Sequence, residues 1–445
     1  MNIEEHIDGE VLLYDYDTDT WHEIATFGDS NVESASTKRQ CCADGAFEIG
    51  GVYGATLSLK VRLTDVTRNQ LRSSKIVLRS RYAQEPEWEP VGEFWVTKVR
   101  GSGDLFTITA EDGMLWADSE TGESVISDTL DDRPETTLEP LIGAGYLTQI
   151  TGQIAIVSAG MHNVLRWSPY DAQANGNYCN EYLLSQNAET HAWEPTAQPA
   201  LVKPYAGSSV AKSTRPRDFY RWAAELAGGF VTIRRDGQLC LRQFGMEELG
   251  TAEIFTADIE ADSADISDFQ LWLQEVSLVP EVAGVEPVTF GVRQAGLSYD
   301  FDYRNHATLR YKVQSNPFLD GLCDRWVARS PSDGKPLSDA KPIAAALWRS
   351  FFNAGRSGNQ TLQIRPFRAT VHKPVRFELG QKIIMHYRDL HETTETTYQS
   401  TVTSVGWTFK GGHAIACGGE NARVAGGRMI TKSDRVSREL LYRTR

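Results

Sequence analysis

Residues 214–244 constrain the fold most, because each boundary of this stretch carries a recognisable signal. Thr214 is a suitable N-cap, and Pro216 stands where the first turn of a helix tolerates proline. The apolar residues that follow recur at helical spacing and would share one face: Phe219, Trp222, Ala223, Leu226 and Ala227. Gly228 and Gly229 then offer the left-handed conformation in which many helices end. The sequence therefore predicts an amphipathic helix that stops at this glycine pair.

A β-hairpin is expected directly after the glycines. Residues 230–233 (FVTI) favour a strand, the Asp-Gly within 235–237 favours a turn, and residues 238–244 favour the returning strand. Helix and hairpin together predict a small α+β module.

Strand patterns dominate the first 117 residues. Between residues 55 and 63 (ATLSLKVRL) apolar and polar residues alternate, which is the period of a half-buried strand. Further strands are expected at 10–16, 75–81, 93–99 and 105–110. Short strands at this spacing favour a small barrel or sandwich, with the glycines at 45, 50, 51 and 54 at bulges or corners.

Strand patterns return after residue 250. The expected strands lie at 270–279, 288–292, 360–364, 370–372, 382–387, 397–405 and 413–417. Short helices are expected at 137–144 and from Pro342 to Phe352. The chain thus begins and ends with β-domains, and its helices lie between them. The predicted fold class is mainly β with α+β inserts, in several domains.

Changes in composition divide the chain into five expected parts. An acidic, polar run around residues 118–133 marks the first boundary. The parts are an N-terminal β-barrel domain at 1–117, a second, loop-rich α+β domain at 118–205, the helix–hairpin module of a third domain at 206–250, a β-rich region at 251–420 that completes the third domain and forms a second β-barrel, and a basic tail at 421–445.

Composition and charge exclude some classes of protein. With 41% hydrophobic and 10% aromatic residues, the 445-residue chain can bury a core and is not a disordered chain. Its net charge of −14 argues against a protein that grips phosphate backbones. An acidic surface would repel DNA that slides past it, although it could equally serve only to keep the protein in solution. The acidic N-terminus lacks the apolar core of a signal peptide, and no apolar run is long enough to cross a bilayer, so a soluble protein made in the cytosol is expected.

No set of residues predicts a catalytic, cofactor or metal site. His386 and His391 beside Glu392 lack the spacing of a zinc protease and are expected to be solvated loop residues. Five single histidines are expected to be structural: His162, His191, His306, His372 and His413. The six cysteines lack zinc-ligand spacing and are expected to be buried free thiols: Cys41, Cys42, Cys179, Cys240, Cys323 and Cys417. No Gly-x-Ser-x-Gly elbow or phosphate-binding loop is present.

Several motifs occur in an order that resembles one protein family. They are Phe47-Glu-Ile-Gly50, Gly92-Glu-Phe-Trp-Val-Thr97, the run DLFTITAEDGMLWADS, the helix–hairpin PRDFYRWAAELAGGFVTIRRDGQLCLRQF, Asn316-Pro-Phe-Leu319, VHKPVRFELGQKIIM and TVTSVGWTFKGGHAIACGG. Together they resemble the tail hub, or tail-tip, proteins of Gram-positive siphophages and prophages, including the N-terminal hub portion of tail-associated lysins and prophage endopeptidase tail proteins. The resemblance covers residues 1–120 and 213–420; Gln381 stands where the family usually has Asp.

The resemblance implies a structural virion protein made in the host cytoplasm and located at the distal end of a tail. Two tube-type β-barrel domains per subunit would give a homotrimer a pseudo-sixfold ring that matches the hexameric tail tube. The implied partners are the distal tail protein or tail tube ring, the C-terminus of the tape-measure protein, and receptor-binding or fibre proteins. DNA would pass through a gated channel without sequence-specific binding. The implied protein is not an enzyme and needs no cofactor.

Other interpretations stay open. The hub of a contractile tail or injection apparatus shares the two-barrel plan, and a secreted cell-wall-active enzyme is disfavoured because no converging pair of acids is seen. About 25 residues follow the last expected hairpin, too few for a hydrolase domain. The basic tail is either a flexible terminus or an arm that docks on an acidic neighbour. The aromatic residues within 167–193 either fill a core or bind a glycan or partner.

Overall fold

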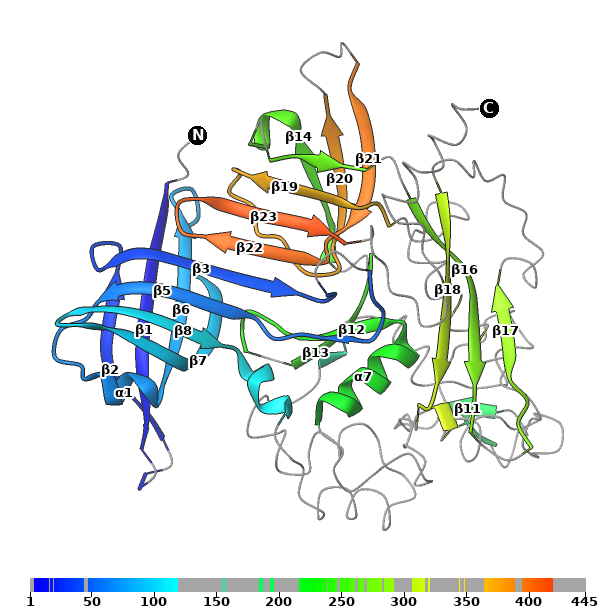
Figure 1. The fold of residues 1–445 in the computed structure, drawn as a ribbon, viewed down its shortest axis with the longest axis horizontal. Helices are drawn as coiled ribbons and strands as arrows, with labels where there is room; N and C mark the ends of the chain where they lie inside the picture. The colour runs from blue at the N-terminus through cyan, green and yellow to red at the C-terminus, as the bar shows by residue number, and fades with distance from the viewer. Residues whose placement is uncertain are drawn as a thin grey trace, which may run out of the picture.

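The computed structural model describes residues 4–118, 216–291, 306–320 and 364–418, with short gaps in each, together with 155–156, 184–186, 193–195, Ala344 and Trp348. Its strands are arranged in sheets of eleven, four, three, three and two strands (Figure 1). This architecture confirms the mainly β fold class. In the part of the chain so described, no helix has the length and apolar character needed to span a membrane.

The N-terminal region is antiparallel throughout. Its elements are β1 (Glu5–Asp15), β2 (Thr20–Gly28), β3 (Val32–Gln40), β5 (Thr56–Arg62), the short helix α1 (Arg68–Arg72), β6 (Ser74–Tyr82), β7 (Glu89–Ser102) and β8 (Leu105–Glu111). The alternation predicted for residues 55–63 is confirmed, because Leu57, Leu59 and Val61 are fully buried in β5. Strands β2 and β3 were not predicted from the sequence.

The long strand β7 folds this region into two layers. Its first half pairs with β6 and its second half pairs with β8, with a register shift between Val96 and Lys98. A bulge of this kind bends a strand and increases its twist. The strands β1, β2 and β6 therefore run across β3, β5 and β8 (Figure 1), and the apolar side chains of both layers pack into one core.

The C-terminal region also has two sets of strands. One set contains β15 (Asp265–Ile266), β19 (Phe367–Val371), β22 (Ser404–Thr408) and β23 (Gly412–Cys417). The other contains β14 (Thr251–Phe255), β20 (Lys382–Tyr387) and β21 (Thr396–Thr401). The single strand predicted at 397–405 was wrong, because the chain leaves one sheet after Thr401 and enters the other at Ser404. Between them, Val402 N donates to Gln381 O at 2.9 Å and Thr403 N donates to Ala416 O at 2.8 Å.

The two ends of the chain meet in one sheet. Strand β22 pairs antiparallel with β3, from Ser404 opposite Gln40 to Thr408 opposite Ser36. The resulting eleven-stranded sheet has the order β15-β19-β23-β22-β3-β5-β8-β7-β6-β1-β2. The first and last β regions are thus hydrogen-bonded neighbours, a contact that the sequence did not predict.

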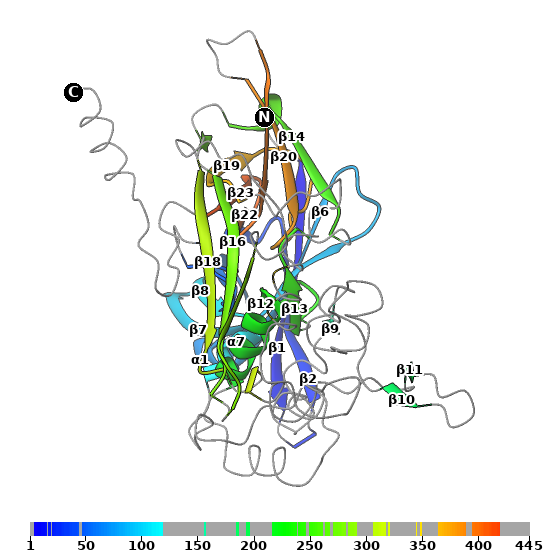
Figure 2. The ribbon, with the colours of Figure 1, turned by 90° about the vertical axis from the view of Figure 1, so that its right-hand side faces the viewer.

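The helix–hairpin module is confirmed. Its elements are α7 (Pro216–Ala227), β12 (Gly229–Ile233) and β13 (Leu239–Gln243), flanked in the sheet by the two-residue strands β4 (Gly51–Val52) and β9 (Ala155–Ile156). Figure 2 shows α7 beside this hairpin. The helix buries Tyr220, Trp222 and Ala224; the other side chains predicted for its apolar face, and Thr214, lie outside the described residues.

One glycine ends the helix, not two. Gly228 has a φ of 69°, whereas Gly229 has no positive φ and already forms the first residue of β12. The prediction that both adopt the left-handed conformation was therefore wrong for Gly229. A single left-handed residue suffices to reverse the chain out of a helix.

A third group of strands contains β16 (Gln270–Val279), β17 (Val288–Gly291) and β18 (His306–Gln314). The strands predicted at 270–279 and 288–292 are confirmed by β16 and β17. A two-stranded ribbon pairs β10 (Leu184–Gln186) with β11 (Trp193–Pro195), and short 3-10 turns span Gly113–Asp118 and Thr256–Asp258. Ala344 and Trp348, within the predicted 342–352 helix, are helical and buried.

Several predictions fall on residues outside the described part: the helix at 137–144, most of 118–205 and the basic tail at 421–445. The domain boundaries stay predictions.

Replacing Gly228 with alanine tests the left-handed helix end. We expect the free energy of unfolding to fall by about 1 kcal/mol, because a Cβ is disfavoured at this positive φ. Urea unfolding followed by circular dichroism would measure the change. Gly28→Ala is the matched control, since Gly28 has no positive φ and the atom nearest to a new Cβ there, Ile7 O, would lie 3.5 Å away. Equal losses in both variants would contradict the assignment.

Candidate functional site: a buried ionic junction

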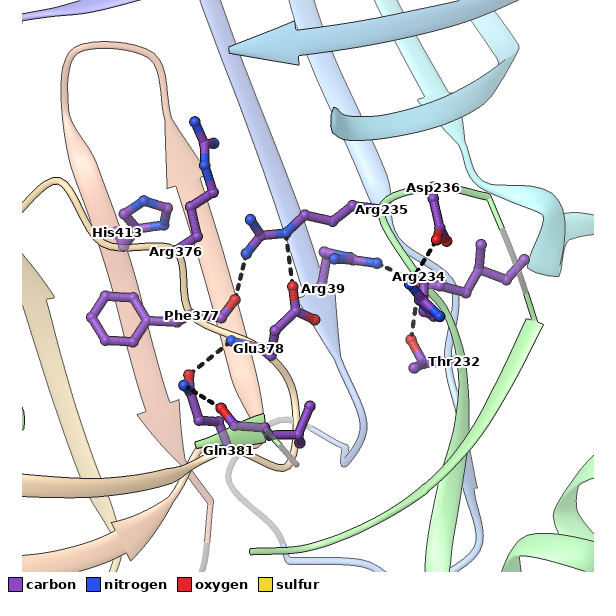
Figure 3. Close-up of polar contacts among 12 residues, drawn as sticks. Arg39, Thr232, Arg234, Arg235, Asp236, Arg376, Phe377, Glu378, Gln381 and His413 are labelled. Atoms are coloured by element: carbon purple, nitrogen blue, oxygen red, sulfur yellow. Dashed lines mark hydrogen bonds and ion pairs between the residues drawn. The ribbon is translucent and has the colours of Figure 1, made fainter. Parts of the chain in front are cut away.

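Three arginines act electrostatically on one carboxylate where the two β regions and the helix–hairpin module meet. Figure 3 shows two of them, Arg39 and Arg235, beside Glu378. Arg39 lies on β3, Arg235 on the hairpin turn and Arg242 on β13, whereas Glu378 lies in the loop between β19 and β20. Arg235 Nε is 3.2 Å from Glu378 Oε1, and Arg242 Nη1 is 2.9 Å from Glu378 Oε2. We call these four residues the ionic junction.

Main-chain hydrogen bonds complete the junction. Arg39 donates to the carbonyl of Ile233 at the end of β12, and Arg235 Nη2 donates to Phe377 O at 2.5 Å. The Glu378 amide donates to Gln381 Oε1 at 3.1 Å, while Gln381 Nε2 donates to Leu249 O at 2.9 Å. The loop that carries Glu378 is therefore held by hydrogen bonds from Arg235, within the loop through Gln381, and from Gln381 to Leu249.

The charges of the junction depend on one another. Burial alone would raise the pKa of Glu378, but Arg235, Arg39 and Arg242 together lower it to about 2. Burial lowers the pKa of Arg39 to about 10, and Glu378 opposes this shift. At neutral pH all four groups are therefore charged. Arg235 and Arg242 both contact Glu378, so removal of this carboxylate would leave two buried charges without their ion-pair partner.

A second set of contacts joins β6 to the same loop and to β23. Arg376 donates to Ser80 Oγ at 2.9 Å, to Ser80 O at 3.0 Å and to Glu85 Oε2 at 2.7 Å. Tyr82 and His413 share a hydrogen bond of 2.6 Å between the hydroxyl and Nε2. Burial lowers the pKa of His413 to about 3, and the nearby Arg235 and Arg376 act in the same direction. His413 is therefore neutral at physiological pH.

A buried glutamate ties the first strand to the last hairpin. Glu5 of β1 accepts from Trp407 Nε1 at 2.8 Å and from the Lys410 amide at 3.0 Å. Burial raises the pKa of this carboxyl, and the two donors oppose that shift. Side chains on β1, β3 and β6 thus each contact the C-terminal region.

The histidines named from the sequence lie apart from one another wherever the structure describes them. The prediction that His386 is a solvated loop residue was wrong: it lies in β20, stacks on Phe255 with ring centroids 4.6 Å apart, and places Nδ1 3.3 Å from Glu395. His372 lies 3.8 Å from Glu260, and His413 is a packing residue of the junction. His162, His191, His391 and the side chain of His306 lie outside the described residues.

The cysteines follow the prediction wherever the structure describes them. Cys41, Cys42, Cys240 and Cys417 are buried free thiols, and Cys179 and Cys323 lie outside the described residues. Within the described segments, no three His, Cys, Asp or Glu side chains are grouped so that they could hold a metal ion.

The arginines of the junction were missed by sequence reasoning, although a signal was present. Arg242 follows Cys240 at a spacing of two in β13, and Arg39 follows Thr37 in β3, so both occupy core-facing positions. A charged residue at such a position needs a buried partner. The sequence gives no means of identifying that partner as Glu378.

The comparisons with known proteins add distant likenesses. No family model matches the chain, and no curated protein matches it. The chain is similar to the 43 kDa tail protein of prophage MuSo2 from Shewanella oneidensis, at 9% identity over 92% of this chain and 97% of that one, with a TM-score of 0.38. It is also similar to the tail protein from Neisseria meningitidis MC58, at 8% identity over 93% and 95%, with a TM-score of 0.41. A chain of the phage P2 baseplate in its activated conformation with Ca matches at 11% identity over 93% and 98%, with a TM-score of 0.29.

These TM-scores are too low for the likenesses to establish the fold or the activity of this chain. The charged groups of the ionic junction bind one another and connect separate segments of the fold, which is a structural role. Its carboxylate is held ionised by arginines, and the neighbouring His413 is held neutral by burial, so neither group is poised to exchange protons near neutral pH.

Replacing Glu378 with glutamine tests whether the ionic junction stabilises the fold. We expect the free energy of unfolding at pH 7 to fall by about 3–5 kcal/mol, because one partner of a buried ion network is lost. Glu378 has a folded-state pKa of about 2, below its ordinary 4.5, so its contribution is complete above pH 4.5 and disappears as the pH falls towards 2. Urea titrations at pH 7 and pH 3 would measure both effects.

The control for this variant is Glu33→Gln, which removes an exposed carboxylate that contacts Lys60 and Arg62 at 2.7 and 2.8 Å. Exposed pairs contribute little, so its stability should remain close to that of the unaltered protein. A Glu378→Gln protein as stable as this control would contradict the role of the junction.

The hydrogen bond between the Tyr82 hydroxyl and His413 offers a second test, with a smaller expected loss of stability. Tyr82→Phe removes the only hydrogen-bond partner of the buried His413 ring within the described segments, since Nδ1 has none there. We expect a loss of about 1–3 kcal/mol in thermal or urea unfolding. Tyr387→Phe, whose half-buried ring lies at the end of β20, should change stability far less.

Proposed function

We propose that the protein is a tail hub, or tail-tip, protein that caps the distal end of a phage tail tube and forms and gates the channel through which DNA leaves. The observation that carries the proposal is the pairing of β3 with β22. Through it, one chain contributes two adjacent β regions to a single sheet. The family resemblance of residues 1–120 and 213–420 supports the same conclusion.

The two β regions suit a ring of three chains. Each has two sets of strands that cross one another, and they lie side by side at the β3–β22 contact. Three copies would then present six similar segments around an axis, and a threefold object could bind a sixfold tube with matched contacts. A homotrimer is therefore the assembly proposed.

The ionic junction supports a mechanical role. A ring at the end of a tube bears load when the tip engages a host, so its segments must keep their relative positions. Glu378 and its arginines connect the two β regions through the helix–hairpin module, and Arg376 adds a direct contact to β6.

The proposed partners are the distal tail protein or the tail tube ring above, the C-terminus of the tape-measure protein inside, and receptor-binding or fibre proteins below. The proposed location is the virion, at the distal end of the tail. Gating is proposed to accompany host engagement, and DNA is proposed to pass without recognition of its sequence. No catalytic activity is proposed.

The mass of the purified protein in solution tests the assembly. Native mass spectrometry and sedimentation velocity should detect three chains per particle, and electron microscopy should show a ring with an open or plugged centre. A protein that stays monomeric across the micromolar range, or forms twofold dimers, would contradict the proposal. Clearing of peptidoglycan by the purified protein would instead favour the cell-wall enzyme. A hub of a contractile tail would give the same ring and differ in the neighbouring proteins.

A further inference from the structure

We propose that the solvent side of strands β22, β3, β5, β8 and β7 binds the phosphate backbone of duplex DNA weakly and without sequence preference. This inference rests on the proposed function, because the DNA in question is the DNA that is proposed to pass through the channel. We call this surface the hydroxyl–cation face and define it by two rows of side chains that the strand register places next to one another.

The first row crosses four strands. Ser34 of β3 lies opposite Lys60 of β5, Lys60 lies opposite Thr107 of β8, and Thr107 lies opposite Arg100 of β7. Ser34, Thr107 and Arg100 are exposed, and Lys60 has 43% of its side chain exposed. Two hydroxyls and two cations therefore alternate across the sheet.

The second row crosses five strands. Thr408 of β22 lies opposite Ser36, Ser36 opposite Ser58, Ser58 opposite Thr109, and Thr109 opposite Lys98. This row therefore consists of four hydroxyl side chains followed by one lysine at its end. The rows are two residues apart along each strand, roughly 7 Å, and neighbouring strands are about 4.8 Å apart. The face therefore continues across the β3–β22 contact.

The core fixes which side of the sheet these residues occupy. Leu57, Leu59 and Val61 alternate with Ser58 and Lys60 along β5 and are fully buried on the other side. A slip of one residue would expose them, so the register and the polar face are specified together.

The electrostatics of this face differ from those of the whole chain. The chain has a net charge of −14, yet the two rows contain three cations, Lys60, Lys98 and Arg100, and no acid. The acids beside the rows are Glu33 of β3 and Glu111 of β8. Glu33 is shared by Lys60 and Arg62, at 2.7 and 2.8 Å. Lys98 and Arg100 are exposed and have no ion pair among the residues that the structure describes. For this face alone, the proposal departs from the expectation that an acidic surface repels DNA.

The chemistry selects phosphate over other parts of a duplex. Lysine, arginine, serine and threonine side chains are the usual donors to phosphate oxygens. The face is defined by side chains of strands alone, whereas base edges are read by a helix or ribbon that enters a groove. Contact with the backbone alone would be weak and salt-dependent, which allows a duplex to slide.

The test is fluorescence anisotropy of a labelled duplex of mixed sequence, titrated with the full chain at 50 and 200 mM KCl. With about three phosphate contacts, the affinity should fall by about 40-fold between these two salt concentrations. The variant Lys98→Gln/Arg100→Gln should bind more weakly and show a slope of log affinity against log salt that is shallower by about 2. Circular dichroism and thermal melting would verify that the variant is folded.

The matched control is Arg310→Gln/Lys312→Gln, which removes the same charge from β18 in a different sheet. Its DNA affinity should equal that of the unaltered protein. No binding at 50 mM KCl, or equal weakening in both variants, would overturn the inference. Tighter binding of a poly-glutamate peptide than of the duplex would also overturn it, in favour of an acidic protein partner. A threefold ring that fails to bind DNA would refute this inference alone, whereas DNA binding by a persistent monomer would refute the hub.

Discussion

The structure depends on one strand pairing, that of β3 with β22. It unites two β regions from opposite ends of the chain and makes their backbone polar groups satisfy one another. Without it, both strands would be open sheet edges, which pair readily with other chains. The side chains beside the pairing reinforce it: Arg39 extends from β3 to the hairpin, and Glu5 of β1 holds the turn after β22.

Both apolar and ionic contacts join the modules. Trp407 of β22 packs in the N-terminal core, and the rings of Phe47 and Phe244 lie 4.7 Å apart, while guanidinium groups, a carboxylate and a neutral histidine are buried where the modules meet. Buried ion networks seldom add stability over an apolar core, but they tolerate only one geometry. Such contacts suit the place where the two β regions and the helix–hairpin module meet, because the proposed ring requires these three parts to keep their relative positions.

Local patterns predicted local structure well. The alternation around Leu57 and Leu59 located β5, and the glycine after Ala227 located the end of α7. Strands β2 and β3 were missed because their inward positions are weakly apolar: Phe27 is the one fully buried residue described in β2, and β3 turns Thr37 and Arg39 inward. The junction could not be predicted, since the sequence does not reveal that Glu378 meets Arg235 and Arg242. Those contacts arise from the tertiary fold.

The position of Glu378 in the chain has a consequence for biosynthesis. The ribosome makes Arg39, Arg235 and Arg242 long before it makes the carboxylate that neutralises them. Until then, Arg235 and Arg242 lack the carboxylate that they contact in the folded protein, and a buried charge needs such a partner. The ionic junction can therefore form only after residue 378 has been made, so its contacts are absent from any shorter polypeptide.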